Sequence, residues 1–404
     1  MQPVVNIGTA GHVDHGKTTI VEAITGVWTS AHSEELRRGI TIRVGYADAA
    51  FYKCSAHSDP DSYTTFPKCP RCGSETTLLR VVSFVDCPGH ESLMANMLSG
   101  AAVMDGAILV IAANEKVPQP QTREHLLALQ MLGLKQLVIV QNKVDLLDDE
   151  NSQANRSDIE KFIEGTIAEG APIIPLSAQH RLNLDALIQA MEETIKTPER
   201  KPNAPPFMQI LRSFDVNRPG AKVSELKGGV VGGTLVEGEL SMGAGVELRP
   251  GSLDERTSKY NPIRTEVASL GTSAGFVEKV RPGGLAAVGT KLDPALTKSD
   301  ALLGSVLGLP EALPPVLNEL TLHTELFETA VGAPELVKVE KIRMNEALRL
   351  NVGTAVTLGT VTSVRGDVVE QKLRRPVCAA PGSRVAMSRR IGDRWRLIGS
   401  GAVK

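Results

Sequence analysis

The stretch that decides the fold is Gly11-His12-Val13-Asp14-His15-Gly16-Lys17-Thr18. It matches GxxxxGK[ST], the phosphate-binding loop, and it lies between an apolar run that ends at Thr9 and a helical pattern over Thr19–Thr25. Its glycines allow the loop to wrap around phosphates with the N–H groups pointing inward, Lys17 supplies a point charge, and the Thr18 hydroxyl is a Mg²⁺ ligand. We expect the imidazoles of His12 and His15 to shape the loop. The predicted nucleotide contacts here are Asp14, His15, Gly16, Lys17, Thr18 and Thr19.

Around this loop the chain alternates buried apolar runs with helical patterns up to residue 200. The predicted strands are Val4–Thr9, Val81–Val85, Ala107–Ala112, Leu137–Val140 and Ile173–Leu176, and the predicted helices include Gln121–Leu132 and Leu184–Ile195. Such alternation is typical of an α/β domain with a mainly parallel sheet. We therefore predict a nucleotide-binding domain over residues 1–200.

Two breaks divide the rest of the chain. The segment 197–206 is polar and proline-rich, which disfavours both helix and sheet, and a second proline-rich break lies around 309–315. Glycine-rich, alternating runs such as Gly228–Gly233 and Thr354–Val364 follow these breaks. This pattern predicts two β-barrel domains, at 206–316 and 317–404.

The bulk composition, 42% hydrophobic and 22% charged, is that of an ordinary globular protein without an apolar run of membrane-spanning length. The amino terminus lacks the basic start and long apolar stretch of a signal peptide, so we expect a cytoplasmic protein without membrane contact. The net charge of −2 is unevenly distributed, because residues 341–404 hold thirteen Lys/Arg and four Asp/Glu. A polyanionic partner would prefer this end, although a barrel with a basic surface explains the excess equally well.

A second motif selects the base. Asn142-Lys143-Val144-Asp145 follows the strand Leu137–Val140. The Asp145 carboxylate can accept hydrogen bonds from N1–H and the N2 amino group of guanine, a donor pair that adenine lacks. Lys143 can cover the base plane and Asn142 can tie this loop to the phosphate loop. Ser177-Ala178-Gln179 after the last strand is a weaker candidate for a backbone contact to the guanine carbonyl.

Two further loops are candidate switches. Asp86-Cys87-Pro88-Gly89-His90 follows a strand, so Asp86 is placed near Mg²⁺ and Gly89 near the γ-phosphate. Gly39-Ile40-Thr41-Ile42 is the other, with Thr41 as a Mg²⁺ ligand only when the γ-phosphate is present. His90 lies where an attacking water must be oriented, which makes it the candidate catalytic residue. The alternative is a purely structural role in the loop. The predicted catalytic residues are His90, Lys17 and Thr41.

With these motifs the chain resembles the translational GTPases related to elongation factor Tu, which join a GTP-binding domain to two β-barrels. More narrowly it resembles the gamma subunits of archaeal and eukaryotic translation initiation factor two, and the short amino terminus resembles the archaeal type. The narrower resemblance rests on the phosphate loop, on Arg38–Ala47, on a cysteine-containing insert at about 52–76, and on Val216–Gly220. It covers nearly the whole chain.

The resemblance implies binding of GTP/GDP and hydrolysis of GTP, with methionylated initiator tRNA carried in the GTP state to the small ribosomal subunit. It also implies a heterotrimer with an alpha and a beta subunit. In family members the residues at Asp14 and the Gly39 carbonyl contribute to a second Mg²⁺.

The insert departs from the family pattern of two Cys-x-x-Cys pairs. Its first pair is Cys54-Ser55-Ala56-His57 and its second is Cys69-Pro70-Arg71-Cys72. Imidazole replaces thiolate readily at Zn²⁺, so Cys54, His57, Cys69 and Cys72 form a complete structural Zn²⁺ set. The alternative is reduced thiols without metal.

Two other functions fit the same motifs. A tRNA-carrying elongation factor, of the selenocysteine-specific or Tu type, would share the nucleotide domain and both barrels, but is not expected to carry the cysteine insert. A GTP-controlled assembly switch with a protein partner is the alternative from another class. Nucleotide-dependent tRNA binding separates these possibilities.

Overall fold

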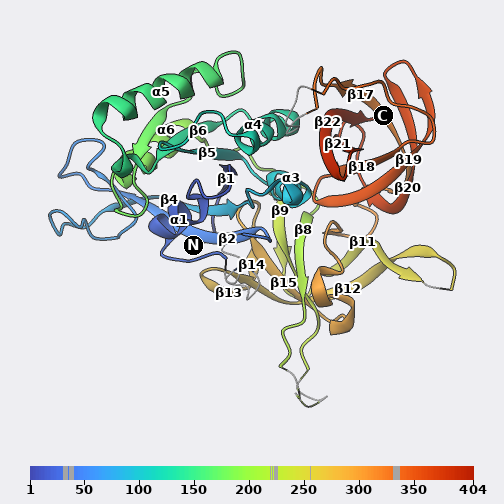
Figure 1. Cartoon of the computed structure of the whole chain (residues 1–404). Helices are drawn as coiled ribbons and strands as arrows, with labels where there is room; N and C mark the ends of the chain where they lie inside the picture. Colours follow the sequence, from blue (N-terminus) through green and yellow to red (C-terminus); the bar gives the residue numbers. More distant parts are fainter. Residues whose placement is uncertain are drawn as a thin grey trace. The chain divides into compact units, whose positions relative to one another are not determined.

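The structure, a computed structural model, describes all residues except 31–34, 36–40, 219, 221, 223–225, 255 and 331–336 (Figure 1). It divides into two compact units. The amino-terminal unit runs from Pro3 to Pro198, and the barrel unit holds Glu199–Ala330 and Lys338–Lys404. Each is described by itself.

The amino-terminal unit is built on one seven-stranded sheet in the order β3-β2-β4-β1-β5-β6-β7. The pairs β1–β4, β1–β5, β5–β6 and β6–β7 are parallel, whereas β2 runs antiparallel to β4 and to β3. All five predicted apolar runs are strands of this sheet, which confirms the predicted α/β class. The strands are β1 (Val5–Gly11), β2 (Gly45–Lys53), β3 (Tyr63–Thr64), β4 (Thr77–Asp86), β5 (Gly106–Ala112), β6 (Leu137–Asn142) and β7 (Ile173–Leu176).

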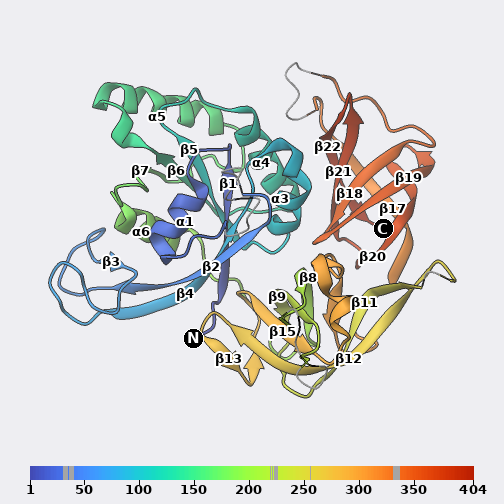
Figure 2. The ribbon, with the colours of Figure 1, turned by 60° about the horizontal axis from the view of Figure 1, so that its bottom comes forward.

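Helices cover both faces of this sheet. In Figure 2, α3 and α4 lie to the right of β1, whereas α1 and α6 lie to its left. Helix α4 ends at Gly133, whose φ of 80° is the left-handed conformation that favours glycine at a helix C-terminus. The helical segments are α1 (Lys17–Thr25), η1 (Glu91–Leu93), α3 (Met94–Ala101), α4 (Pro120–Leu132), η2 (Val144–Leu146), α5 (Asp149–Ile163) and α6 (Leu184–Thr194).

Strand β2 did not emerge from the sequence. Its side chains alternate between buried and half-buried over most of its length, whereas every residue of β1 and β5 is buried. An alternating pattern is the weaker signal of an antiparallel strand near a sheet edge. Between β2 and β4 the chain makes the insert that carries three of the five cysteines.

The first barrel closes through β11 and β12. Its strand order is β11-β16-β8-β9-β15-β12-β13, and an additional antiparallel pairing of β11 with β12 completes the ring. Its elements are β8 (Phe207–Phe214), β9 (Val230–Glu237), β10 (Leu240–Ser241), β11 (Gly245–Asp254), β12 (Lys259–Thr272), β13 (Gly275–Val277), β14 (Lys279–Val280), β15 (Ala286–Thr290), η4 (Pro294–Leu296), η5 (Lys298–Asp300) and β16 (Val306–Gly308).

The second barrel is closed in the order β17-β20-β19-β18-β21-β22, with every neighbouring pair antiparallel. Aliphatic side chains from the strands fill its core. Two barrels after the α/β unit confirm the predicted fold class. The strands are β17 (Val316–Leu326), β18 (Ala347–Val352), β19 (Ala355–Arg365), β20 (Val368–Cys378), β21 (Arg384–Ile391) and β22 (Arg394–Val403).

Among the described residues, none of the helices has both the length and the apolar character that crossing a membrane requires.

Candidate functional site

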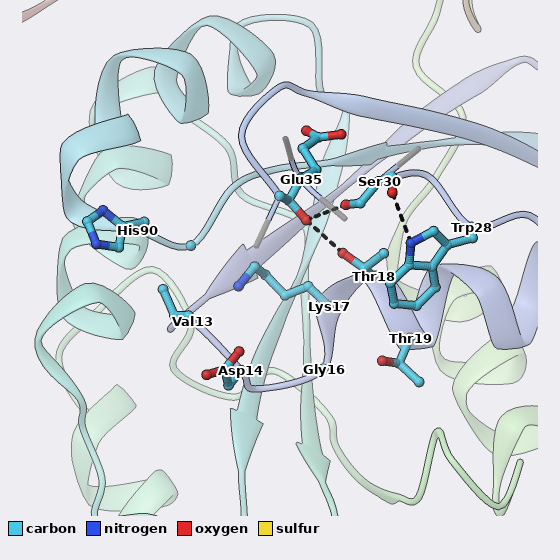
Figure 3. Close-up of a pocket in the computed structure, with 12 residues that line it drawn as sticks. Val13, Asp14, Gly16, Lys17, Thr18, Thr19, Trp28, Ser30, Glu35 and His90 are labelled. Atoms are coloured by element: carbon cyan, nitrogen blue, oxygen red, sulfur yellow. Dashed lines mark hydrogen bonds between the residues drawn. The ribbon is translucent and has the colours of Figure 1, made fainter. Parts of the chain in front are cut away.

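The phosphate loop connects the buried strand β1 to helix α1. Gly16 has a φ of 91°, in the left-handed region, and a side chain there would collide with the amide of Asn142. Asp14 also has a positive φ, of 60°. The loop borders a cavity of about 290 Å³ (Figure 3). Its lining residues are Val13, Asp14, Gly16, Lys17, Thr18, Thr19, Trp28, Ser30, Glu35, Thr41, Gly89 and His90.

Lys17 places a buried ammonium group at this cavity. Its Nζ donates to the carbonyl of Gly11 at 3.0 Å and to that of His12. Burial lowers the pKa of Lys17 to about 8, against the opposing effect of the Asp86 charge. Gly89 lies so close to Lys17 Nζ that a Cβ at position 89 would collide with it. The cavity therefore offers a poorly solvated positive charge to an anionic group.

Three oxygens meet beside Lys17. The Thr18 hydroxyl lies 3.0 Å from the Thr41 hydroxyl and donates to Asp86 Oδ2 at 2.7 Å. Ligands on neighbouring corners of a Mg²⁺ octahedron, at about 2.1 Å from the ion, lie about 3.0 Å apart. The hydroxyls of Thr18 and Thr41 therefore have the spacing of two Mg²⁺ ligands, and Asp86 holds the Thr18 hydroxyl.

The predicted switch segment is described in part. Thr41 lies at the cavity, whereas Gly39 falls outside the described residues. The Ser30 hydroxyl is 2.7 Å from that of Thr41. Buried Glu35 accepts hydrogen bonds at 2.9 Å from the backbone N–H groups of Ile42 and Arg43. Thr41 and the two residues that follow it are thus held by hydrogen bonds.

His90 lies at the rim of the cavity with its imidazole exposed. Its Nδ1 accepts a hydrogen bond from the backbone N–H of Ser92 at 3.2 Å and lies 2.8 Å from the Ser92 hydroxyl. In Figure 3 the ring points away from Lys17. The neutral ring in this position carries its proton on Nε2. His90 must therefore turn inward before it can orient a water molecule in the cavity.

The predicted base-binding residues gather after β6 and β7. Asn142 Nδ2 donates to the His15 carbonyl at 2.9 Å, and Asn142 Oδ1 accepts from the N–H of Ala178 at 3.1 Å. This one side chain thus joins the phosphate loop to the loop after β7, as the sequence predicts. Lys143 has a φ of 63°, and Asp145 Oδ2 lies 3.7 Å from His180 Nε2. Ser177 is buried and Gln179 is exposed in the same loop.

His15 faces the interior instead of the cavity. Its side chain is 1% exposed, with Nδ1 3.1 Å from the Val110 carbonyl and Nε2 3.3 Å from Glu115. Burial lowers the pKa of this imidazole to about 4, so the ring is neutral. Of His15, the backbone alone remains to contact a nucleotide.

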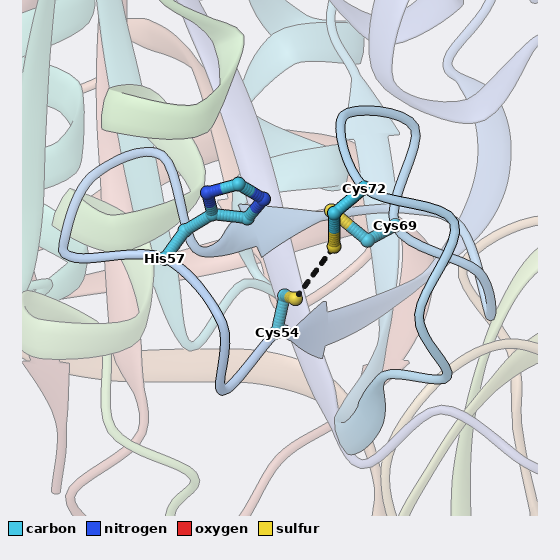
Figure 4. A group of neighbouring side chains, drawn as sticks. All are labelled: Cys54, His57, Cys69 and Cys72. Atoms are coloured by element: carbon cyan, nitrogen blue, oxygen red, sulfur yellow. Dashed lines mark hydrogen bonds between the residues drawn. The ribbon is translucent and has the colours of Figure 1, made fainter.

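The four predicted zinc ligands come together in the insert. The ligand atoms of Cys54, His57, Cys69 and Cys72 all lie within 4.8 Å of one another (Figure 4). The Sγ atoms of Cys54 and Cys72 are 3.7 Å apart, and neighbouring thiolates in a tetrahedral site with Zn–S of about 2.3 Å lie about 3.8 Å apart. His57 Nε2 is buried and has no hydrogen-bond partner among the residues that the structure describes. A divalent ion would satisfy this nitrogen, so the residues fit zinc.

Comparisons with known proteins agree with this geometry. The family model for the elongation factor Tu GTP-binding domain matches residues 2–197, and that for the C-terminal region of initiation factor eIF2 gamma matches residues 318–403. "Translation initiation factor 2 subunit gamma" from Archaeoglobus fulgidus is 59% identical over 100% of this chain and 95% of its own length. The same subunit from Methanocaldococcus jannaschii is 54% identical over 100% of this chain and 98% of its own.

The chain belongs to the family of translation initiation factor 2 gamma subunits. It is a translational GTPase, an enzyme that hydrolyses GTP, and its site accordingly serves GTP/GDP with Mg²⁺. The predicted family and activity are thereby confirmed, and the two relatives named above are archaeal.

Solved structures of other translation factors share this gamma-subunit architecture. A bacterial selenocysteine-specific elongation factor has a TM-score of 0.74 at 22% identity, covering 100% of this chain and 58% of that one. Elongation factor SelB from Methanococcus maripaludis, crystallised with a GTP analogue, has a TM-score of 0.73 at 19% identity, covering 100% and 79%. At such identities the likeness shows the fold alone.

Sequence reasoning missed several side chains that build this GTPase site. His125 is fully buried in α4 and its Nδ1 accepts from the N–H of Gly11 at 2.9 Å, which fixes the start of the phosphate loop. Burial lowers the pKa of His125 well below its usual value, so the ring stays neutral. Thr29 donates to Asp86 at 2.6 Å, and Trp28 donates from Nε1 to the Ser30 carbonyl at 3.0 Å. The one signal in the sequence for this role of His125 was its position inside the predicted helix Gln121–Leu132.

Proposed function

We propose that this gamma subunit, in its GTP state, binds methionylated initiator tRNA and delivers it to the small ribosomal subunit. In this proposal it acts in the cytoplasm with an alpha and a beta subunit, and hydrolysis resets the switch. The observation that carries the proposal is the identity of more than half of the residues to named gamma subunits over the whole chain. The contact between Thr18 and Thr41 supports it, because it connects a switch segment directly to the ion and phosphate site.

In this proposal, the phosphate loop and the Asn142–Asp145 motif together hold the nucleotide. Backbone N–H groups of the phosphate loop bind the phosphates and Lys17 neutralises the β- and γ-phosphates. Asp145 accepts from the guanine N–H groups, Lys143 covers the base, and Asn142 sets the distance between base and phosphates. The proposed contacts are Asp14, His15, Gly16, Lys17, Thr18, Thr19, Asn142, Lys143, Asp145, Ser177, Ala178 and Gln179.

Thr18 and Thr41 would hold Mg²⁺, which neutralises charge on the phosphates when bound. In this proposal Thr41 ligates the ion only when the γ-phosphate is present. Asp14 and Gly39 remain proposed ligands of a second ion. Asp86 and Gly89 complete the proposed switch, Asp86 by holding the Thr18 hydroxyl.

Hydrolysis requires a water molecule in line with the γ-phosphate. We assign His90 to orient it, after its ring has turned inward from the Ser92 contact. A ring nitrogen of the inward-facing imidazole then forms a hydrogen bond with this water, and Lys17 stabilises charge on the departing phosphate. Since the ring lies outward without a bound partner, hydrolysis by the isolated protein is expected to be slow.

In the insert, Cys54, His57, Cys69 and Cys72 would bind a structural zinc ion. All four tetrahedral positions are then protein ligands, which leaves no open position for a substrate. The domain limits we propose are 1–200 for the GTP-binding domain with the insert at about 52–76, 206–316 for the first barrel, and 317–404 for the second.

The test is filter binding of methionylated initiator tRNA to protein loaded with a non-hydrolysable GTP analogue or with GDP. We expect much tighter binding in the GTP state, and weaker binding of uncharged or elongator tRNA. Thr41→Ala should reduce the difference between the two states. Thr360→Ala, at an exposed threonine of the second barrel, should leave it unchanged. Equal affinities in both states would refute the carrier role and favour a switch with a protein partner.

A further inference from the structure

A groove of about 1130 Å³ lies within the barrel unit. Residues from the β11–β12 hairpin of the first barrel form one side, and residues from the second barrel form the other. The barrels pack closely there, since a Cβ on Gly304 would lie 2.6 Å from the Cα of Ala355. None of the residues that line the groove belongs to the GTP-binding unit. The groove is therefore separate from the nucleotide site.

Cations dominate the charged residues that line this groove. Among the described lining residues, Glu319 is the single carboxylate. The described carboxylates make no ion pair with any of the cations in the groove, whereas Arg389 on the neighbouring strand pairs with Glu346. Uncompensated charge of one sign in a cleft attracts an anionic ligand. The five cations are Lys259, Arg349, Lys372, Arg374 and Arg375.

Aromatic rings accompany the charges. The guanidinium of Arg349 lies over the indole of Trp395, with Cζ 5.3 Å from the ring centre. Arg349 Nε is buried, and no described residue forms a hydrogen bond with it. Tyr260 from the opposite barrel also lines the groove. Cations mixed with aromatic faces are the composition of sites for single-stranded nucleic acid, where phosphates meet cations and bases stack on rings.

We propose that this inter-barrel groove binds a short segment of single-stranded RNA. The volume exceeds the about 300–1,000 Å³ of pockets for small molecules, which favours a segment of several nucleotides over a single anion. The aromatic faces favour stacked bases over the aliphatic side chains of an acidic peptide. Because none of the described switch residues lines the groove, binding is independent of the bound nucleotide in this proposal, unlike the proposed carriage of tRNA.

The probe is hexauridylate RNA, and the signal is the quenching of tryptophan fluorescence. The chain has two tryptophans, Trp28 and Trp395, and Trp395→Phe should abolish the quenching while the emission of Trp28 remains. In the full-length protein we expect quenching with equal affinity in the GTP and GDP states. Lys372→Ala combined with Arg374→Ala should weaken binding about 10-fold and reduce the slope of log affinity against log salt by about 1.4.

The matched control is Lys341→Ala combined with Arg365→Ala, which removes two exposed cations outside the groove. An equal loss in both double variants would overturn the proposal in favour of non-specific attraction to a basic barrel. Quenching by an oligoglutamate peptide but not by RNA would overturn it in favour of a protein partner. Hexadeoxyuridylate tests whether the 2′-hydroxyl contributes, and groove-dependent binding of both oligomers still supports a site for single strands.

Discussion

The phosphate site and the cysteine cluster lie in the same unit but are stabilised differently. In the phosphate site, the polar groups have partners from the chain itself: Lys17 donates to two carbonyls, and Thr18 contacts Asp86 and Thr41. In the cluster, His57 Nε2 is buried without a partner and two thiols lie at the spacing of metal ligands. The comparison indicates that the first site is organised before its ligand arrives, whereas the second needs an ion. A substitution that disables one site should therefore leave the other intact.

The largest effect is expected at the cluster. Cys69→Ser removes one of four ligands, and structural zinc contributes about 10–16 kcal/mol in small zinc domains. We predict about one zinc per wild-type chain and near none in the variant by metal analysis, with GTP affinity largely retained. Cys378→Ser, at a cysteine outside the cluster, is the control.

The same measurement tests the fourth ligand. His57→Ala should also lower the zinc content, and full retention of zinc would exclude His57 from the ligand set. A wild-type protein that is folded but free of metal would leave only reduced thiols in the insert.

The next largest effect is expected in the base-binding loop, where a substitution should lower GTP affinity and leave zinc binding intact. Asp145→Asn replaces an acceptor of two N–H groups, each hydrogen bond to a charged group being worth roughly 1.5–3 kcal/mol, so GTP affinity should fall about 10²- to 10⁴-fold. Affinity for xanthosine triphosphate should rise, because the amide donates where xanthine has a carbonyl. Competition binding measures both, and zinc content should stay the same. An unchanged affinity for GTP would show that Asp145 does not contact the base.

A smaller effect concerns hydrolysis. His90→Ala should slow single-turnover hydrolysis of GTP by roughly 10²-fold with little change in GTP affinity, because water is oriented mainly in the transition state. His323→Ala, at a histidine of the second barrel that is 50% exposed, serves as the control. Equal rates for His90→Ala and wild type would leave His90 a structural role in capping η1.

The smallest effect is expected in the pH dependence of GTP affinity, which tests the charge of Lys17. Lys17 is charged below its lowered pKa of about 8 and neutral above it, and bound phosphates favour the charged form. GTP affinity should therefore fall by about 10-fold from pH 7 to pH 9. This fall corresponds to about 1.4 kcal/mol of binding free energy. Lys17→Arg stays charged throughout, so its affinity should lack this decline. A flat profile for the wild-type protein would contradict a depressed pKa.

The sequence by itself determined the local parts of this protein. The buried runs around the phosphate loop predicted the parallel strands, and the Asn142–Asp145 motif predicted the loop that joins the phosphate and base sites. Both signals are short-range: a strand buried on both faces must be apolar throughout, and a phosphate loop needs glycine at fixed spacing. The set Cys54, His57, Cys69 and Cys72 was likewise visible because its pairs are close in sequence.

The tertiary structure alone decided which distant residues support these motifs. His125 reaches Gly11 across 114 residues, and Glu35 holds the backbone beyond Thr41. The direction of the His15 ring and the outward position of His90 also depend on packing and on a local hydrogen bond. The basic groove forms because separate barrels bring Lys259 and Arg374 to one cleft, and loop closure between distant segments leaves no periodic pattern in the sequence.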